Sequence, residues 1–333
     1  MKYSQTNFNN KTILITGGAG FIGSNLAFYF QEHYPDSRIV IFDCFRSEAK
    51  FSNGNLQSFG HYKNLIGFTG DITCGNINNP DDLALLNHNK FDYIFHQAAI
   101  SDTRVYDQEI VMKTNVNSFY WFLEKAKKDN ATLIYASSAA TYGSMPSPQK
   151  IGFENPENPY GYSKYAMDQI AAQFSKKNPN IKIIGLKFFN VYGSKEYFKA
   201  KTSSMVIQLG HQILKGMSPK LFYGSDEIFR DFVYIKDVIQ ANIKACNSSK
   251  NGVYNVGSGK ARSFQDIVNI LQTNLGSNLE IEYFDNPYNG YQMHTQADIS
   301  STMNDFDYRP AYSLEDGISE YIPEIIRLID ETI

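Results

Sequence analysis

The sequence predicts an α/β protein built on a doubly wound parallel sheet, with a smaller α/β lobe in its C-terminal half. Short apolar segments and longer amphipathic segments alternate through the first half, which is the order of strands and crossover helices. The apolar segments lack strict polar–apolar alternation, as expected of strands covered by helices on both faces. From about Phe189 onward, loop-like stretches interrupt the helical segments, which predicts a different and smaller unit.

The individual elements follow from local composition. Strands are expected at residues 11–16, 38–42, 65–69, 93–96, 133–136 and 181–188. Helical spacing appears between them at 21–34, 81–87, 109–128 and 160–177. In the second half, helices are expected at 205–215, 237–247, 263–275 and 314–328, and loops at 192–202 and 286–296. We expect one lobe over residues 1–188 and a smaller one over 189–333, with a soft boundary because no low-complexity linker separates them.

Composition excludes several classes of protein. The net charge is −3 and lysines are scattered among acids, which argues against a nucleic-acid partner. Three cysteines, Cys44, Cys74 and Cys246, share no metal-like spacing and are expected to be reduced thiols. No apolar run approaches the roughly 18 residues that span a bilayer, and residues 1–10 lack the apolar core of a secretory signal. We therefore expect a cytoplasmic protein with no metal and no membrane contact.

A glycine-rich turn follows the first predicted strand in the segment TILITGGAGFIG. Its glycines recur at three-residue spacing between a strand and a helix: Gly17, Gly20 and Gly23. Such a turn lets the helix amides reach a pyrophosphate.

Asp43 ends the next strand, where a carboxylate accepts hydrogen bonds from the ribose of NAD. Arg46 and Lys50 follow and either neutralise the 2′-phosphate of NADP or belong to a solvated loop. The turn predicts a nicotinamide dinucleotide and leaves NAD and NADP open.

Two further strand ends are predicted to meet this cofactor. Asp71-Ile72 follows the third strand, where a side chain and a backbone amide can contact adenine. Gln97-Ala98-Ala99 follows the fourth, where small residues let the backbone pass under the cofactor. His96 lies on an apolar strand and is interpreted as a core residue rather than a catalyst.

A tyrosine and a lysine open the helix at 160–177. Tyr160 and Lys164 are four residues apart and therefore share one helical face. A nearby ammonium lowers the pKa of a phenol, so this tyrosine can take the hydroxyl proton of an alcohol. Ser138, at the end of the fifth strand, can share the substrate oxygen. The pattern predicts an alcohol-oxidising or carbonyl-reducing site.

The motifs TGGAGFIGSN, FHQAA, YASSAATYG, PYGYSK, FFNVYG and RDFVYIKDV resemble those of the extended short-chain dehydrogenases, and within them the sugar-nucleotide epimerases. The resemblance covers essentially the whole chain. It implies a Rossmann-type NAD(P)-binding domain over 1–188, with Ser138 hydrogen-bonding the substrate, Tyr160 as base and Lys164 as ribose anchor. Asn115 matches a position that holds the active-site helix and cofactor. Further implied cofactor contacts are Phe21, Ile22, Cys44, Ile100, Ser101, Val191 and Lys199.

The second half narrows the resemblance to the ADP-glyceromanno-heptose 6-epimerases, through FNVYGSKEYFK, PKLFYGS, RDFVY and TQAD. This likeness implies an ADP-heptose substrate from the pathway to the heptose of lipopolysaccharide core, a homo-oligomer with a pentamer among the options, and NADP, because Lys50 matches a position that contacts it. Lys199 matches a second catalytic base. Implied substrate contacts are Asn190, Arg230, Tyr291 and the loop Phe222, Tyr223, Gly224 and Ser225.

The sequence departs from this family in three places. Lys199 is followed by Ala200-Lys201 where the family usually has a glycine, so Lys201 is a rival second base and a candidate substrate contact. An insert at 52–63 lengthens the loop after Asp43 and obscures the 2′-phosphate contacts. Gln208 stands where a substrate-contacting histidine is often found.

Three other functions compete with this interpretation. A UDP-hexose 4-epimerase shares the serine, tyrosine and lysine but needs no second base and is expected to hold NAD. A 4,6-dehydratase places Asp and Glu where this chain has Ala139 and Ala140. A non-catalytic nucleotide sensor typically loses the tyrosine–lysine pair, which this chain keeps.

Overall fold

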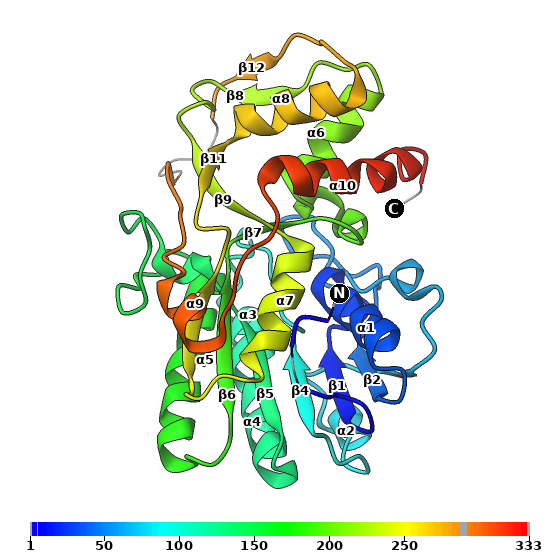
Figure 1. The fold of residues 1–333 in the computed structure, drawn as a ribbon, viewed down its shortest axis with the longest axis vertical. Coiled ribbons are helices and arrows are strands. Elements are labelled where there is room, and N and C mark those ends of the chain that lie inside the picture. The colour runs from blue at the N-terminus through cyan, green and yellow to red at the C-terminus, as the bar shows by residue number, and fades with distance from the viewer. Residues whose placement is uncertain (1, 5, 287–291, 332–333) are drawn as a thin grey trace.

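A computed structural model describes residues 2–4, 6–286 and 292–331. A seven-stranded sheet forms its centre in the order β10-β6-β5-β4-β1-β2-β3 (Figure 1). Every neighbouring pair in this sheet is parallel, which confirms the predicted fold class. The strands are β1 (Thr12–Thr16), β2 (Arg38–Asp43), β3 (Asp71–Cys74), β4 (Tyr93–His96), β5 (Thr132–Ser138), β6 (Ile183–Phe188) and β10 (Gly252–Val256).

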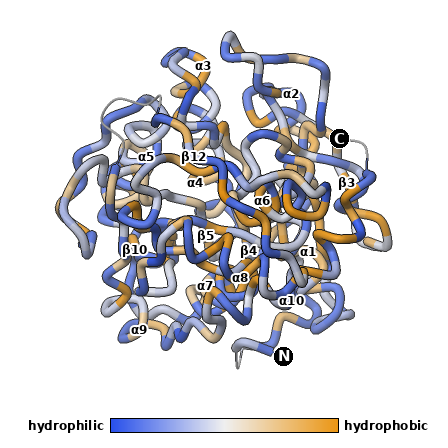
Figure 2. Tube along the Cα trace, turned by 90° about the horizontal axis from the view of Figure 1, so that it is seen from above, coloured by the Kyte–Doolittle hydropathy of each residue, from blue (hydrophilic) through white to orange (hydrophobic). Residues whose placement is uncertain are grey.

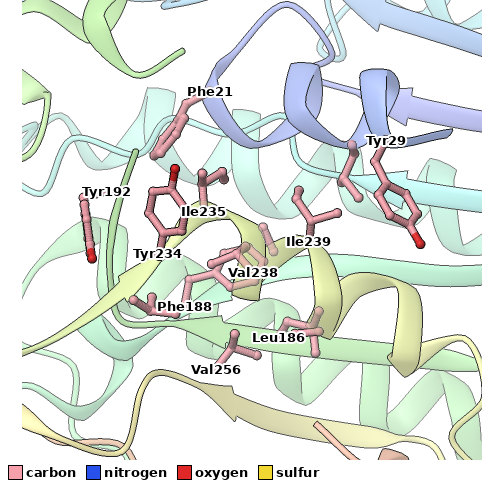
Figure 3. Packing of buried hydrophobic residues seen from close by; sticks show 14 of the residues in the cluster. Phe21, Tyr29, Leu186, Phe188, Tyr192, Tyr234, Ile235, Val238, Ile239 and Val256 are labelled. Carbon is pink, nitrogen blue, oxygen red and sulfur yellow. The ribbon is translucent and has the colours of Figure 1, made fainter. Parts of the chain in front are cut away.

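Helices cover both faces of this sheet, which explains the continuous apolar strands. On β1, Ile13 and Ile15 enter one buried cluster and Leu14 enters the other. The first cluster contains side chains of α1 (Phe21–His33) and α7 (Ile235–Ala245), and Figure 3 shows α7 side chains over Leu186 and Val256. The second contains side chains of α2 (Pro80–Ala84), α4 (Ser118–Asp129) and α5 (Pro159–Lys177). Hydrophobic segments accordingly run through the middle of the molecule (Figure 2).

The second half contributes to both the central sheet and a smaller lobe. Strand β10 pairs with β6, and α9 (Ser300–Phe306) packs on it through Phe306 and Tyr254, whose ring centroids are 5.0 Å apart. The remaining elements lie beyond the carboxyl ends of the central strands (Figure 1). They are β7 (Asn190–Tyr192), β9 (Phe229–Tyr234) and β11 (Ala261–Ser263) in one sheet, β8 (Lys220–Phe222) and β12 (Glu282–Phe284) in another, and α6 (Met205–Leu214), α8 (Phe264–Leu275) and α10 (Leu314–Arg327).

The strand expected at residues 65–69 is wrong. Leu65 ends a 3₁₀ turn, Tyr62–Leu65, and the third strand begins only at Asp71. Because β3 is the edge strand and its residues are mostly exposed, it carries no apolar run. The third strand was instead predicted at the apolar residues just before β3.

The helix expected at 109–128 is interrupted. It consists of α3 (Gln108–Met112), a π-helical turn at Lys113–Asn117 and α4. π-helical turns of this kind are rare and occur frequently at functional sites. Here the turn carries Asn115, whose side chain reaches toward the active-site helix.

Two further findings concern membranes and thiols. Within residues 2–4, 6–286 and 292–331, no helix has the length and apolar character that crossing a membrane requires. All three cysteines are free thiols, and Cys44 and Cys74 are exposed whereas Cys246 is buried.

His96 lies at the end of β4 inside the core. Its Nδ1 is 2.8 Å from the Thr16 hydroxyl, and its ring packs against Phe119 and Phe122. Burial, and to a lesser degree the charge of Lys164, lowers the pKa of His96 to about 3. The folded protein therefore keeps this imidazole neutral where the unfolded chain protonates it.

We expect acid to destabilise the fold through His96. Below the ordinary histidine pKa of about 6.5, only the unfolded chain binds the proton, so the free energy of unfolding falls by about 2 kcal/mol between pH 6.5 and 5.0. His96→Phe should remove this part of the pH dependence, measured by urea unfolding at several pH values. His88→Phe, at an exposed position, is the control. Equal slopes for wild type and His96→Phe would contradict the assignment.

Candidate active site

A cavity of about 1040 Å³ opens at the carboxyl ends of the central strands and extends to the smaller lobe. It lies where the strand order reverses, since β1 has β2 on one side and β4 on the other. Ligands of doubly wound folds bind at such a point. Most of the predicted site residues line this cavity: Gly17, Gly20, Phe21, Ile22, Gly23, Asp43, Cys44, Gln97, Ala98, Ala99, Ile100, Ser101, Ser138, Tyr160, Lys164, Asn190, Val191, Lys199 and Arg230.

The glycine turn brings the start of α1 close to β1. A Cβ atom on Gly23 would lie 2.2 Å from the Gly17 carbonyl oxygen, so only glycine permits this approach. Helix α1 begins after Gly20, which lines the cavity together with Phe21 and Ile22. The first amides of α1 therefore open on the cavity, as a pyrophosphate requires.

Asp43 is fixed at the end of β2. Its two carboxylate oxygens accept hydrogen bonds from the amides of Ala19 (2.9 Å) and Phe45 (2.7 Å). Burial raises the pKa of this carboxyl, and the two amides oppose that effect. The carboxylate thus bridges the glycine turn and the loop that follows β2, on the wall of the cavity.

The long loop after β2 passes along the cavity, and Ser47, Phe51 and residues 57–60 line it. Arg46 and Lys50, predicted to meet a 2′-phosphate, do not line it. The Arg46 guanidinium donates a hydrogen bond through Nη2 to the Phe198 carbonyl, while its buried Nε has no hydrogen-bond partner among the described residues. Lys50 is exposed.

The predicted adenine contacts Asp71 and Ile72 are wrong. Asp71 pairs with Val40 in the sheet, so both residues lie at the start of β3, away from the cavity. Cys74 ends the strand, and residues 75–78 line the cavity instead. The error follows from the misplaced strand, because the true strand end lies three residues beyond Asp71.

Asn115 does not line the cavity but connects two parts that do. Its amide accepts a hydrogen bond from the Ile100 amide (2.9 Å) and donates to the Ile100 carbonyl (3.0 Å) and the Ser163 hydroxyl (2.9 Å). It thereby ties the segment after β4 to the first turn of α5.

Helix α5 begins with a capped turn against the end of β5. The Asn158 side chain accepts a hydrogen bond from the Gly161 amide (2.8 Å), and Pro159 occupies the first helical position. A Cβ atom on Gly161 would lie 2.4 Å from the Ala140 carbonyl oxygen. Glycine at this position therefore lets the helix start approach the turn after Ser138.

Ser138, Tyr160 and Lys164 meet in the cavity wall. The hydroxyls of Ser138 and Tyr160 are hydrogen-bonded, and burial raises the pKa of Tyr160 while that bond opposes it. Lys164 donates to the Ala136 carbonyl (2.7 Å), and its Nζ lies 5.9 Å from the Tyr160 ring centre. Burial lowers the pKa of Lys164 to about 8, opposed by Asp168. The lowering of the Tyr160 pKa by Lys164 and a bound oxidised nicotinamide stays a prediction.

The two rival lysines lie in different surroundings. Lys199 lines the cavity, its Nζ 5.6 Å from the Phe21 ring centre, and burial lowers its pKa while the carboxylates of Glu196 and Asp102 oppose this. Lys201 is exposed and does not line the cavity. The residue between them, Ala200, has φ +52° and ψ −127°, a conformation that favours glycine. The family's usual glycine at this position fits that conformation.

The predicted substrate residues divide into two groups. Asn190 and Arg230 line the cavity, and Arg230 donates to the Phe229 carbonyl (2.8 Å). Gln208 donates instead to the Ser203 carbonyl (2.7 Å). The cavity lining does not include Gln208, Phe222, Tyr223, Gly224 or Ser225. Tyr291 lies outside the described residues.

Sequence reasoning missed part of the lining. Asp102 and Thr103 follow the predicted residue Ser101, and Thr202, Ser203, Ser204 and Met205 follow the lysine loop. Continuity with predicted neighbours was the available signal for these two groups. Phe232 lies on β9, a strand that was not predicted, whereas Phe264 begins α8, which was predicted as a helix at 263–275 but without a role in the site. Among the described residues, no three His, Cys, Asp or Glu side chains form a group that could hold a metal ion.

The sequence matches the NAD dependent epimerase/dehydratase family over residues 13–257. The chain belongs to this family. Within the epimerase/dehydratase family, it is similar to the Helicobacter pylori ADP-L-glycero-D-manno-heptose-6-epimerase, with 49% identity over 98% of this chain and 99% of that one and a TM-score of 0.90. The predicted resemblance to the sugar-nucleotide epimerases is thus confirmed.

More distant structures share the fold. A Methanobrevibacter ruminantium UDP-N-acetylglucosamine 4-epimerase is 27% identical, with 96% and 99% of the two chains covered and a TM-score of 0.82. A Bacillus cereus UDP-glucuronic acid 4-epimerase, solved with UDP-glucuronic acid and NAD, is 26% identical, with 95% and 99% covered and a TM-score of 0.81. The family and these structures support a nicotinamide dinucleotide and a nucleotide sugar as the classes of ligand.

Proposed function

We propose that this chain is an ADP-glyceromanno-heptose 6-epimerase that interconverts the D-glycero and L-glycero forms of its substrate. The observation that carries this proposal is that Tyr160 and Lys199, two groups able to transfer a proton, line one cavity. The 49% identity to the Helicobacter pylori 6-epimerase supports the choice of sugar. The reaction belongs to the pathway that supplies the heptose of lipopolysaccharide core. Homo-oligomeric assembly and a cytoplasmic location stay predictions.

Inversion at a carbinol carbon requires proton transfer in two orientations of the sugar. The glycine turn and Asp43, which line the cavity, would hold a nicotinamide dinucleotide, and this group would supply the acceptance and return of a hydride at C6″. Tyr160 removes the C6″ hydroxyl proton in one orientation, with Ser138 hydrogen-bonded to the same oxygen. The resulting ketone turns to present its other face, which carries its oxygen away from Tyr160. Lys199 then donates a proton to that oxygen. In the reverse direction, the two residues exchange roles.

The residues of the cavity fit a nicotinamide dinucleotide. The first amides of α1 supply the pyrophosphate site, and the buried Gln97 Oε1 has no partner among the described residues. For NADP, the support is Arg46. It lies between Phe45 and Ser47, which line the cavity, and its buried Nε is unpartnered within the described chain. Because Arg46 does not line the cavity here, the loop after β2 would have to turn its guanidinium toward the cavity for a 2′-phosphate to accept a charge-assisted hydrogen bond from it.

Tyr160→Phe should lower turnover of ADP-heptose by at least about 100-fold, because a general acid/base is lost. Dinucleotide binding and the thermal unfolding midpoint should stay near wild type. Turnover is followed by chromatographic separation of the two epimers. Substantial residual activity in a natively folded variant would mean that another group carries the proton.

Lys199→Met should abolish epimerisation as Tyr160→Phe does, since neither residue reaches the oxygen in both orientations. Lys201→Met is the matched control and should retain near wild-type turnover. A C6″ aldehyde analogue, oxidised and reduced between two molecules, separates the two roles in single and double variants. An inactive Lys201→Met beside an active Lys199→Met would transfer the role to Lys201. Full activity in both would favour a one-tyrosine 4-epimerase.

Arg46→Ala should weaken NADP binding by about 10- to 100-fold, the effect of losing a hydrogen bond to a charged group. NAD binding should change little, because NAD has no 2′-phosphate. Titration calorimetry on protein freed of nucleotide measures both affinities, with Lys50→Ala as the exposed basic control. Equal loss for NAD and NADP would show that Arg46 acts through the loop rather than through the phosphate.

A further inference from the structure

Lys199 belongs to the second half of the chain, yet in the proposed reaction it acts beside a dinucleotide held by the glycine turn of the first half. It lies in the lysine loop, residues 193–201, directly after Phe198 in a 3₁₀ turn. Successive side chains of such a turn point about 120° apart. Phe198 is buried, whereas Lys199 lines the cavity. The contacts that hold Phe198 therefore also set the position of Lys199.

Three residues of the loop after β2 contact Phe198. The imidazole of His61 stacks on its ring, with the ring centres 3.9 Å apart and the planes 3° from parallel. The Arg46 guanidinium donates a hydrogen bond to the Phe198 carbonyl. The Lys63 ammonium lies 6.0 Å from the centre of the Phe198 ring. Phe198 is thus held both at its ring and at its backbone.

His61 is in turn fixed to the glycine turn. Its amide donates a hydrogen bond to the carbonyl of Ala19 (3.0 Å), which lies within that turn and also accepts from the Asn64 side chain (3.0 Å). The Asn64 carbonyl accepts a hydrogen bond from the Lys195 ammonium (2.6 Å), which is a second link to the lysine loop. His61 and Asn64 therefore bridge the glycine turn and the lysine loop.

His61 lies in the insert at 52–63, for which neither the fold nor the proposed reaction otherwise accounts. Ser58, Phe59 and Gly60, just before it, line the cavity, but His61 does not. Arg46 is also the proposed partner of a 2′-phosphate, so a variant of Arg46 would combine two effects. His61 is outside the cavity lining and can influence the reaction only through the residues that it contacts.

We propose that His61 is a positioning residue, which holds Lys199 at the place relative to the glycine turn that proton transfer requires. The inference rests on the proposed role of Lys199 as the second acid/base. The stacked ring pair and the hydrogen bonds of His61 and Asn64 span the two halves of the chain at this point. A displacement of about 1 Å at a reacting group can cost about 100-fold in rate.

His61→Phe and His61→Leu are the matched variants. Burial, together with the charges of Arg46 and Lys63, lowers the pKa of His61, so the imidazole stacks as a neutral ring that phenylalanine can imitate. Leucine is an apolar side chain without a ring. Both variants lose the hydrogen bond that His61 Nδ1 accepts from the Lys63 amide (3.2 Å). The difference between the two variants therefore isolates the stack.

The first measurement is amide hydrogen exchange of the purified full-length protein without substrate, followed by peptide mass spectrometry. The Lys199 amide donates a hydrogen bond to the Glu196 carbonyl (2.9 Å), so opening of the lysine loop exposes this amide to exchange. Exchange of peptides that cover residues 193–201 should be about 3- to 10-fold faster in His61→Leu than in His61→Phe, the effect of losing one aromatic pair.

Two further variants keep the comparison specific. Phe198→Leu removes the other ring and should match His61→Leu, and the double variant should add little, because both changes break the same contact. Tyr120→Leu removes an exposed ring on α4 and should leave exchange of the lysine loop at the wild-type rate.

The second measurement separates the two proton-transfer groups. Each epimer is oxidised with its C6″ hydroxyl at a different group, so Lys199→Met should slow oxidation of one epimer and Tyr160→Phe that of the other. His61→Leu should slow oxidation of the same epimer as Lys199→Met, by about 10-fold relative to His61→Phe, with KM little changed. Oxidation is followed in the first turnover by the absorbance of the reduced nicotinamide. A merely structural role would slow both epimers.

Equal exchange in folded His61→Phe and His61→Leu, or equal slowing of both epimers in His61→Leu, would overturn the inference. Exchange is read without substrate, so it remains informative if the proposed function fails. An active Lys199→Met beside a clear exchange difference would refute the second base but retain the hold of His61 on the lysine loop.

Discussion

The relative position of Ser138 and Tyr160 depends on one buried carboxylate, that of Asp168. Asp168 lies on α5 and accepts hydrogen bonds from the hydroxyls of Tyr135 (2.9 Å) and Ser137 (2.9 Å) on β5. It also accepts one from the Lys187 ammonium on β6 (2.7 Å). Removing one partner of such a pair leaves an uncompensated buried charge and costs about 3–5 kcal/mol. The helix that carries the tyrosine and the strand that carries the serine are therefore held in register.

Most of the fold could be predicted because its strands are covered on both faces. Ile13, Leu14 and Ile15 are all buried, so the absence of polar–apolar alternation in such segments indicated a parallel sheet. The predicted strand positions are wrong where burial ends. The edge strand β3 is mostly exposed, and its position was lost together with the residues after it. The strands β7 and β8 of the smaller lobe are three residues long, and pairings such as β7 with β9 join segments far apart in the sequence.

The candidate site could be predicted where local chemistry defines it. The glycine turn and the tyrosine–lysine pair each belong to one continuous segment, and both lie on the cavity. Lys199 came from resemblance, because an isolated lysine in a loop carries no pattern. For Asp102, the only signal was its position directly after the predicted residue Ser101. Its hydrogen-bond partners Asn53 and Asn55 lie 49 and 47 residues away in sequence and meet it only in the folded chain.

The pairing of β10 with β6 has a consequence for synthesis of the chain. The central sheet lacks its last strand until residue 256 has left the ribosome, although its other strands are complete by residue 188. During that interval, β6 presents an open edge of unpaired backbone groups, which is a template for pairing with other chains. At about 5–20 residues per second, translation of the intervening segment takes several seconds. The nascent chain thus carries this open sheet edge after its cofactor-binding half has already been made.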